Sequence, residues 1–216
     1  MVRSGSPRVL RLHGFPISNY YNRIKMALKL KGLAFEEVRA APSRDADYLK
    51  INPKGRVPAL ADGDFVVTEN PAILRYIAAR APEKKLWPND PRAEARCMEW
   101  MAWISSGVHI SYAHVRRPER YATGEDALAN VVAKGRESAR DVWEAVEKKL
   151  GAGPWTAGDD YSVADAYLFV FWTWGRGQVL QYDMAKDFPN WTAHARRMGE
   201  RPAVKRALER ENTPLP

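Results

Sequence analysis

Residues 51–77 carry the clearest chemical potential in the chain, because a proline bend is soon followed by a helix start. A bend at Val57 and Pro58, where a cis peptide bond is a candidate, would leave the Val57 backbone groups free for a peptide-like ligand. Asn70 is the predicted N-cap of a helix that opens on Pro71. The amides and dipole of a helix start favour a carboxylate. These groups predict a cradle for a small anionic peptide.

A short hairpin would position the cradle. Residues 56–60 predict an extended run, which Pro58 confines either to a sheet edge or to a strand that begins at that proline. Asp62 and Gly63 separate this run from a second apolar run at residues 65–67, which predicts a tight turn. The predicted helix follows directly through residue 77.

The chain before the cradle predicts a strand, a helix and a second strand. Residues 8–13 alternate as a strand does, residues 19–31 have helical spacing that Gly32 ends, and residues 33–38 read as extended. Residues 39–50 are expected to be irregular. A strand-helix-strand connection implies a parallel pair, so with the hairpin we expect a mixed four-stranded sheet with packed helices.

Two strings, NPKGRVPAL and DGDFVVTENPAILRYIA, resemble the glutathione-binding half of cytosolic glutathione transferases, and the resemblance spans nearly the whole chain. It implies a thioredoxin-like α/β domain followed by an all-α domain. It also implies that the loop at Val57 and Pro58 pairs with the cysteinyl backbone of glutathione, and that Glu69 and Asn70 hold the γ-glutamyl group. Asn70 stands where the family usually has a serine, so that hydroxyl is missing.

Ser18 is the predicted catalytic residue, at the start of the first helix, where serine-type, bacterial-like members place a catalytic hydroxyl. A cysteine thiol has a pKa of about 8.5, and a decrease of roughly 2 units requires about 3 kcal/mol. A helix N-terminus supplies up to about 2 kcal/mol and a hydrogen bond to an anion about 1.5–3 kcal/mol, so neither a metal nor a general base is needed. The alternatives are that Ser18 only caps the helix, or that Asn19, Tyr20 or Tyr21 donates instead.

Other contacts to the ligands follow from the resemblance. Arg44 and Arg56 lie where relatives hold the glycyl carboxylate or the adjoining backbone, with Lys54 nearby, although each is equally a candidate for a solvated surface charge. The electrophile would bind between the domains, against aromatic residues that helical spacing alone would assign to the core. The candidates for this pocket are Trp103, His109, Tyr112 and Arg116, with Trp172 or Trp174.

The second half of the chain shows no convincing strand pattern. We expect domains at residues 1–82 and 92–216, joined by a proline-rich, charged linker at residues 83–91. Ser162 and Asp165 predict a capping box at the start of a strongly apolar helix, with a structural role. Helices are predicted at residues 92–104, 127–150, 163–174, 191–198 and 203–209.

Composition agrees with a soluble, cytoplasmic enzyme. Of 216 residues 45% are apolar, no stretch resembles a signal peptide or membrane span, and Cys97 is the only cysteine. The net charge of +8 is spread among acidic residues, so we expect no nucleic-acid or membrane partner. Histidine spacing predicts no metal site.

We therefore expect a glutathione transferase that conjugates the thiolate of glutathione, its co-substrate, to a hydrophobic electrophile. The family implies a homodimer with a role in detoxification. Two alternatives stay open: a glutathione-dependent isomerase or dehalogenase on the same site, and a non-catalytic binding module of the same fold.

Overall fold

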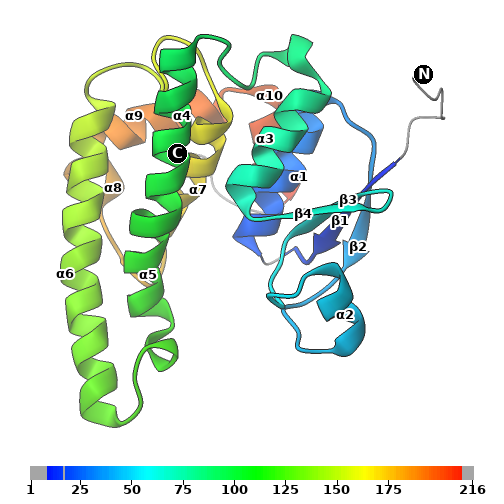
Figure 1. Cartoon of the computed structure of the whole chain (residues 1–216). Coiled ribbons are helices and arrows are strands. Elements are labelled where there is room, and N and C mark those ends of the chain that lie inside the picture. The colour runs from blue at the N-terminus through cyan, green and yellow to red at the C-terminus, as the bar shows by residue number, and fades with distance from the viewer. Residues whose placement is uncertain (1–8, 17, 211–216) are drawn as a thin grey trace, which may run out of the picture. The chain divides into compact units, whose positions relative to one another are not determined.

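The computed structural model describes residues 9–16 and 18–210 (Figure 1). Two compact units divide the chain, one ending at Trp87 and the other beginning at Pro88. This division falls inside the predicted linker, whose bounds stay a prediction. Within the described ranges, no helix combines the length and the apolar character needed to cross a bilayer.

The first unit contains the predicted mixed sheet of four strands, in the order β2-β1-β3-β4. β1 (Leu10–Gly14) pairs in parallel with β2 (Phe35–Arg39), whereas β3 (Ala59–Asp62) pairs antiparallel with both β1 and β4 (Phe65–Thr68). β3 is therefore an inner strand. Of the two alternatives that Pro58 allowed, the prediction of an edge strand is wrong. Because Pro58 has no N–H to donate, the ladder begins one residue after it.

α1 (Asn19–Lys31) connects the two parallel strands and has the predicted caps. The Ser18 side chain accepts a hydrogen bond at its start, and Gly32 ends it with φ of 65°, a left-handed conformation that glycine adopts without steric cost. α3 (Asn70–Arg80) follows β4, and its Ile73, Leu74 and Ile77 are fully buried. A short 3₁₀ turn, Pro82–Lys84, follows α3.

The segment expected to be irregular contains a short helix instead, α2 (Ala46–Ile51). Asp45 caps it by accepting from the Asp47 amide at 2.9 Å, and Tyr48 anchors it by donating its hydroxyl to the Arg56 carbonyl at 2.7 Å. Six residues are too few to show helical periodicity, which is why the pattern escaped notice.

The second unit is built of helices, as expected, but two of them were missed. α4 continues through a π-helical segment, Ile104–Val108, into α5, which is short and polar enough to hide its period. α8 has only four residues. The helices of this unit are α4 (Pro91–Trp103), α5 (His109–Arg116), the 3₁₀ turn Pro118–Arg120, α6 (Glu125–Leu150), α7 (Val163–Gly175), α8 (Met184–Asp187), α9 (Pro189–Gly199) and α10 (Pro202–Arg210).

α7 is buried along almost its whole length, so its first turn needs partners inside the protein. Asp165 Oδ2 accepts from the amide of Ser162 at 2.8 Å and from its hydroxyl at 3.0 Å, which confirms the predicted capping box. Asp165 Oδ1 accepts from the Thr156 amide at 2.8 Å and lies 2.9 Å from His194 Nε2. One fully buried carboxylate therefore satisfies four polar groups.

Asp165→Ala should lower the free energy of unfolding by at least about 3 kcal/mol, because each buried donor left without a partner costs about 1–3 kcal/mol. The measurement is urea unfolding followed by circular dichroism. Asp90→Ala is the matched control: Asp90 is an exposed cap of α4 that accepts from the Ala93 amide, and its loss should cost about 1 kcal/mol. Equal losses in the two variants would contradict the assignment of Asp165 to the core.

Candidate glutathione site

The sheet register brings three separate segments together at one end of the sheet, which we call its site edge because strands end or begin there. His13 pairs with Ala59, and Ala59 pairs in turn with Thr68. β1 ends at this edge, β3 begins there and β4 ends there. The residues that follow β1, precede β3 and follow β4 must therefore be neighbours.

The predicted site residues of the first unit occupy these three positions. Ser18 follows β1, the Val57–Pro58 bond precedes β3, and Asn70 follows β4; the bond is cis, as the sequence suggested. The side chain of Asn70 donates from Nδ2 to the Tyr20 carbonyl at 3.1 Å. That bond joins the start of α3 to the first turn of α1.

Ser18 is half-buried at the N-terminus of α1. Its Oγ accepts from the Tyr21 amide at 3.4 Å, and its own amide donates to the Phe15 carbonyl at 3.0 Å. In this arrangement the hydroxyl oxygen is an acceptor, so the hydroxyl proton is available to a ligand. The side chain of Asn19, another predicted site residue, lies outside the part of the chain that the structure describes.

Tyr21 holds this helix start against the sheet, a role that the sequence did not reveal. Its ring packs on Gly14, where an added Cβ would lie 2.2 Å from Tyr21 Cδ2. Its hydroxyl donates to Glu37 at 2.5 Å, and burial together with that carboxylate raises the pKa of Tyr21. This hydroxyl is thus already engaged, which disfavours Tyr21 as the donor to a thiolate. No local spacing could reveal its partner on β2, 16 residues away.

The start of α3 differs from the prediction in one respect. Glu69, not Asn70, is the N-cap residue, and no side chain caps this helix. Asn70 is the first helical residue, and its side chain is turned toward Tyr20 instead of toward the amides of its own helix. Among the residues that the structure describes, no side chain accepts a hydrogen bond from the N-terminal amides of α3.

Glu69 has an unusual backbone conformation for a residue other than glycine, with φ of 70°. Such a conformation costs about 1–3 kcal/mol and is concentrated at functional sites. The Glu69 carboxylate is exposed and forms an ion pair with Lys54.

The two predicted anion contacts, Arg44 and Arg56, both have exposed side chains. Neither forms an ion pair among the residues the structure describes. The Arg56 carbonyl accepts from Asn52 Nδ2 at 2.6 Å, and an added Cβ on Gly55 would lie 3.6 Å from Arg44 Cδ. Arg56 therefore lies in a hydrogen-bonded loop, three residues before the first residue of β3.

The predicted pocket residues of the helical unit fall into two groups. Tyr112 and His109 on α5 contact Trp174 on α7, with ring centroids 4.2 and 6.1 Å apart. Burial raises the pKa of Tyr112, and the charge of Arg116 opposes that shift. Trp103 instead contacts Trp100, at 5.3 Å, and the ammonium of Lys149, at 5.9 Å. Trp172 is buried and donates to the Thr192 hydroxyl at 3.0 Å.

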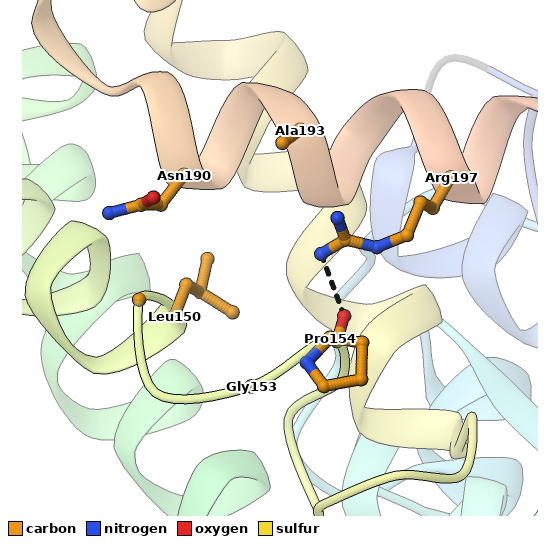
Figure 2. Close-up of a pocket in the computed structure, with 7 residues that line it drawn as sticks. Leu150, Gly153, Pro154, Asn190, Ala193 and Arg197 are labelled. Carbon is orange, nitrogen blue, oxygen red and sulfur yellow. Dashed lines mark hydrogen bonds between the residues drawn. The ribbon is translucent and has the colours of Figure 1, made fainter.

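The helical unit also has a pocket of about 250 Å³ that no predicted site residue lines. Figure 2 shows Arg197 extending from α9 to the Pro154 carbonyl, to which it donates at 2.8 Å. The pocket is lined by Leu150, Gly151, Gly153, Pro154, Asn190, Ala193 and Arg197.

Over residues 9–16 and 18–210, no group of three or more His, Cys, Asp or Glu side chains is placed to hold a metal ion. Cys97 is buried, and burial raises the pKa of its thiol to about 11. A buried thiol with such a pKa is a poor nucleophile at neutral pH.

Comparison with known proteins agrees with this geometry. Residues 12–85 match the family model of the glutathione S-transferase N-terminal domain, and residues 107–202 match that of its C-terminal domain. A glutathione S-transferase of Pseudomonas putida is 30% identical over 213 residues, which cover 96% of this chain and 95% of the relative.

Solved structures show the same relationship. A glutathione transferase homologue from Sulfitobacter, crystallised with bound glutathione, has a TM-score of 0.84 and 33% identity, covering 94% of this chain and 98% of the other. A glutathione S-transferase from Xylella fastidiosa has a TM-score of 0.83 and 28% identity, covering 95% and 100%. The chain therefore belongs to the glutathione S-transferase family, a family of transferase enzymes, and the prediction from its motifs is confirmed.

The contact between Tyr21 and Glu37 should make stability depend on pH. Partial burial disfavours the Glu37 carboxylate, but hydrogen bonds from Lys25 and Tyr21 outweigh it and lower the pKa of Glu37 below its ordinary value. Because the folded pKa is depressed, the stabilisation is present above the unfolded pKa of about 4.3 and is lost as pH falls through the folded value.

Urea unfolding of wild type and Glu37→Gln measures this effect. The variant should be less stable at pH 7, and the difference should shrink steadily below about pH 4.3. A difference that stays constant from pH 7 to pH 3 would show that the charge of Glu37 contributes nothing.

Proposed function

We propose that this protein conjugates the thiolate of glutathione to a hydrophobic electrophile. The observation that carries the proposal is the register of β3 between β1 and β4, which brings the Ser18, Val57 and Asn70 segments to one edge. A helix start, a free backbone segment and a second helix start match the three chemical parts of a small anionic peptide with a thiol.

Each part of glutathione then has a partner. The α-carboxylate of the γ-glutamyl group meets the uncapped amides of α3, beside Glu69 and Asn70. The cysteinyl backbone pairs with Val57, at the cis bond to Pro58. Arg44 and Arg56 serve as secondary contacts to the glycyl carboxylate or the adjoining backbone, and Asn19 adds a contact near the thiol.

Ser18 stabilises the thiolate by donating a hydrogen bond from its hydroxyl to the sulfur. A hydrogen bond to an anion is worth about 1.5–3 kcal/mol and the N-terminus of α1 up to about 2 kcal/mol. At their upper values the two terms sum to about 5 kcal/mol, more than the roughly 3 kcal/mol that a 2-unit decrease in the thiol pKa requires. The thiolate then attacks the electrophilic carbon: the sulfur lone pair forms the carbon–sulfur bond, the bond from that carbon to its leaving group breaks, and the leaving group departs with the electron pair.

His109, Tyr112 and Trp174 form the electrophile pocket in this proposal, with Arg116 at its rim, and Trp103 stays the less supported candidate. The ring contacts among the first three, which also involve Phe171, support the assignment.

We further propose a cytoplasmic homodimer with a role in detoxification, and domains at residues 1–82 and 92–216.

The direct test is a titration of the thiolate ultraviolet absorbance of bound glutathione. The pKa should lie well below that of the free thiol in wild type, and should rise by about 1–2 units in Ser18→Ala, because one hydrogen bond to the anion is lost. At pH 6.5 the turnover rate of Ser18→Ala should be lower than that of wild type, in proportion to its smaller thiolate fraction.

Ser18→Gly separates this role from helix capping, since glycine replaces a serine cap at a cost of only a few tenths of a kcal/mol. The glycine variant should keep nearly full stability and still show the raised thiol pKa. If both variants bind glutathione with the wild-type pKa, Ser18 is only a cap. If wild type binds no glutathione, the proposed function fails.

Tyr112→Ala should raise the KM for an aromatic electrophile several-fold, because the ring that stacks on Trp174 is lost, and should leave the pKa of bound glutathione unchanged. Steady-state kinetics at saturating glutathione measure it. Tyr121→Ala is the matched control, because Tyr121 is an exposed tyrosine of the same unit that stacks on His114. Equal KM values in wild type and Tyr112→Ala would remove Tyr112 from the pocket.

A further inference from the structure

The pocket of the helical unit has no part in the proposed glutathione chemistry, and its volume is about 250 Å³. One wall is the face of α9 that carries Asn190, Ala193 and Arg197 (Figure 2). The facing wall is the end of α6 together with the turn at Gly153 and Pro154. Pockets for drug-sized ligands have about 300–1,000 Å³, so this one suits a smaller molecule.

Arg197 gives the pocket a positive charge, and no acidic residue is among the described residues that line it. The side chain of Arg197 is half-buried and forms no ion pair within the described ranges. A guanidinium has several N–H donors. Its one hydrogen bond to a described residue runs from Nη2 to the Pro154 carbonyl, at 2.8 Å. The wall of the pocket therefore presents a cation whose charge no nearby carboxylate offsets.

Two contacts fix the orientation of this guanidinium. Nη2 is bonded to Pro154, and the ring centroid of Trp155 lies 5.7 Å from the Arg197 Cζ. Nε is buried without a partner among the described residues, so a ligand in the pocket would meet the terminal nitrogens instead. Figure 2 shows these nitrogens directed back along α9 toward Ala193. A planar guanidinium held in this way matches the paired oxygens of a carboxylate or a phosphate.

The opposite end of the pocket is polar but not cationic. Asn190 lies about 10 Å from Arg197 along the axis of α9. The Glu147 carboxylate is close to Asn190, but its two oxygens accept from the amides of Asn190 and Trp191, at 2.8 and 2.9 Å. The start of α9 thus stabilises this negative charge. Glu147 is consequently engaged there and is not a partner of Arg197.

We infer that this pocket binds a small oxyanion, a carboxylate or a phosphate, which Arg197 holds through its terminal nitrogens. The Asn190 amide is available to a polar group at the other end of the same ligand. The inference goes beyond the proposed function, because it concerns the helical unit alone and requires no glutathione. Carboxylate and phosphate share the chemistry that Arg197 recognises, so their relative affinities must distinguish them.

Calorimetric titration of the whole protein with sodium phosphate, and separately with sodium acetate, tests the inference. Sodium chloride keeps the ionic strength constant. Wild type should bind at least one of the two anions, and Arg197→Gln should weaken that binding by about tenfold to a hundredfold, because hydrogen bonds from a charged donor are lost. Arg196→Gln is the matched control, since Arg196 is the exposed neighbour on the same helix, and it should bind as wild type does.

Ala193→Asp is the second variant, which retains Arg197 and fills its charge from within the protein. A carboxylate four residues before an arginine stabilises a helix, so this variant should be at least as stable as wild type in thermal unfolding. It should nevertheless bind the anion as weakly as Arg197→Gln does. The variant thereby separates the loss of the anion site from a loss of structure.

Failure of wild type to bind either anion would overturn the inference, as would equal affinities in wild type and Arg197→Gln. Equal losses in Arg196→Gln and Arg197→Gln would overturn it as well, because binding would then follow net charge and not this pocket. Tighter binding of phosphate would support a phosphorylated ligand, and tighter binding of acetate a carboxylated one. The thiol pKa of bound glutathione tests the proposed function separately, so the two can fail independently.

Discussion

The register that places β3 between β1 and β4 is the constraint on which the site depends. Pairing of Ala59 with both His13 and Thr68 makes the segment at Ser18 a neighbour of the segments at Val57 and Asn70, which lie 39 and 52 residues further along the chain. A slip of one residue would turn the side chains of β3 to the opposite face and move Val57 away from the start of α3. The missing N–H of Pro58 marks where this ladder begins.

Local signals predicted much of this architecture. The caps of α1 at Ser18 and Gly32, the hairpin turn, and the Ser162–Asp165 box each lie within a few residues of their partners, so spacing alone reveals them. The orientation of Asn70 could not be predicted in this way. A local rule makes asparagine an N-cap, but its amide bonds to Tyr20, 50 residues away. The sequence did not predict the Tyr21–Glu37 contact because the two residues are far apart in the chain. It did not predict the short helix α2 because that helix has too few residues to show helical periodicity.

The two units carry different kinds of stabilisation. Polar contacts in the first unit join the starts of α1 and α3, and the Glu69 carboxylate beside them is exposed and paired with Lys54. In the helical unit, Asp165 is enclosed and all its contacts are internal, which suits a residue that stabilises the fold. Burial and satisfied hydrogen bonding thus distinguish a structural carboxylate from the exposed Glu69 at the proposed site.

The most direct test of the central claim is a crystal structure of the protein with glutathione bound. We expect the sulfur within hydrogen-bonding distance of Ser18 Oγ, the cysteinyl backbone paired with Val57, and the γ-glutamyl group at the start of α3. Glutathione bound elsewhere, or bound at this edge with its sulfur directed away from Ser18, would contradict the account.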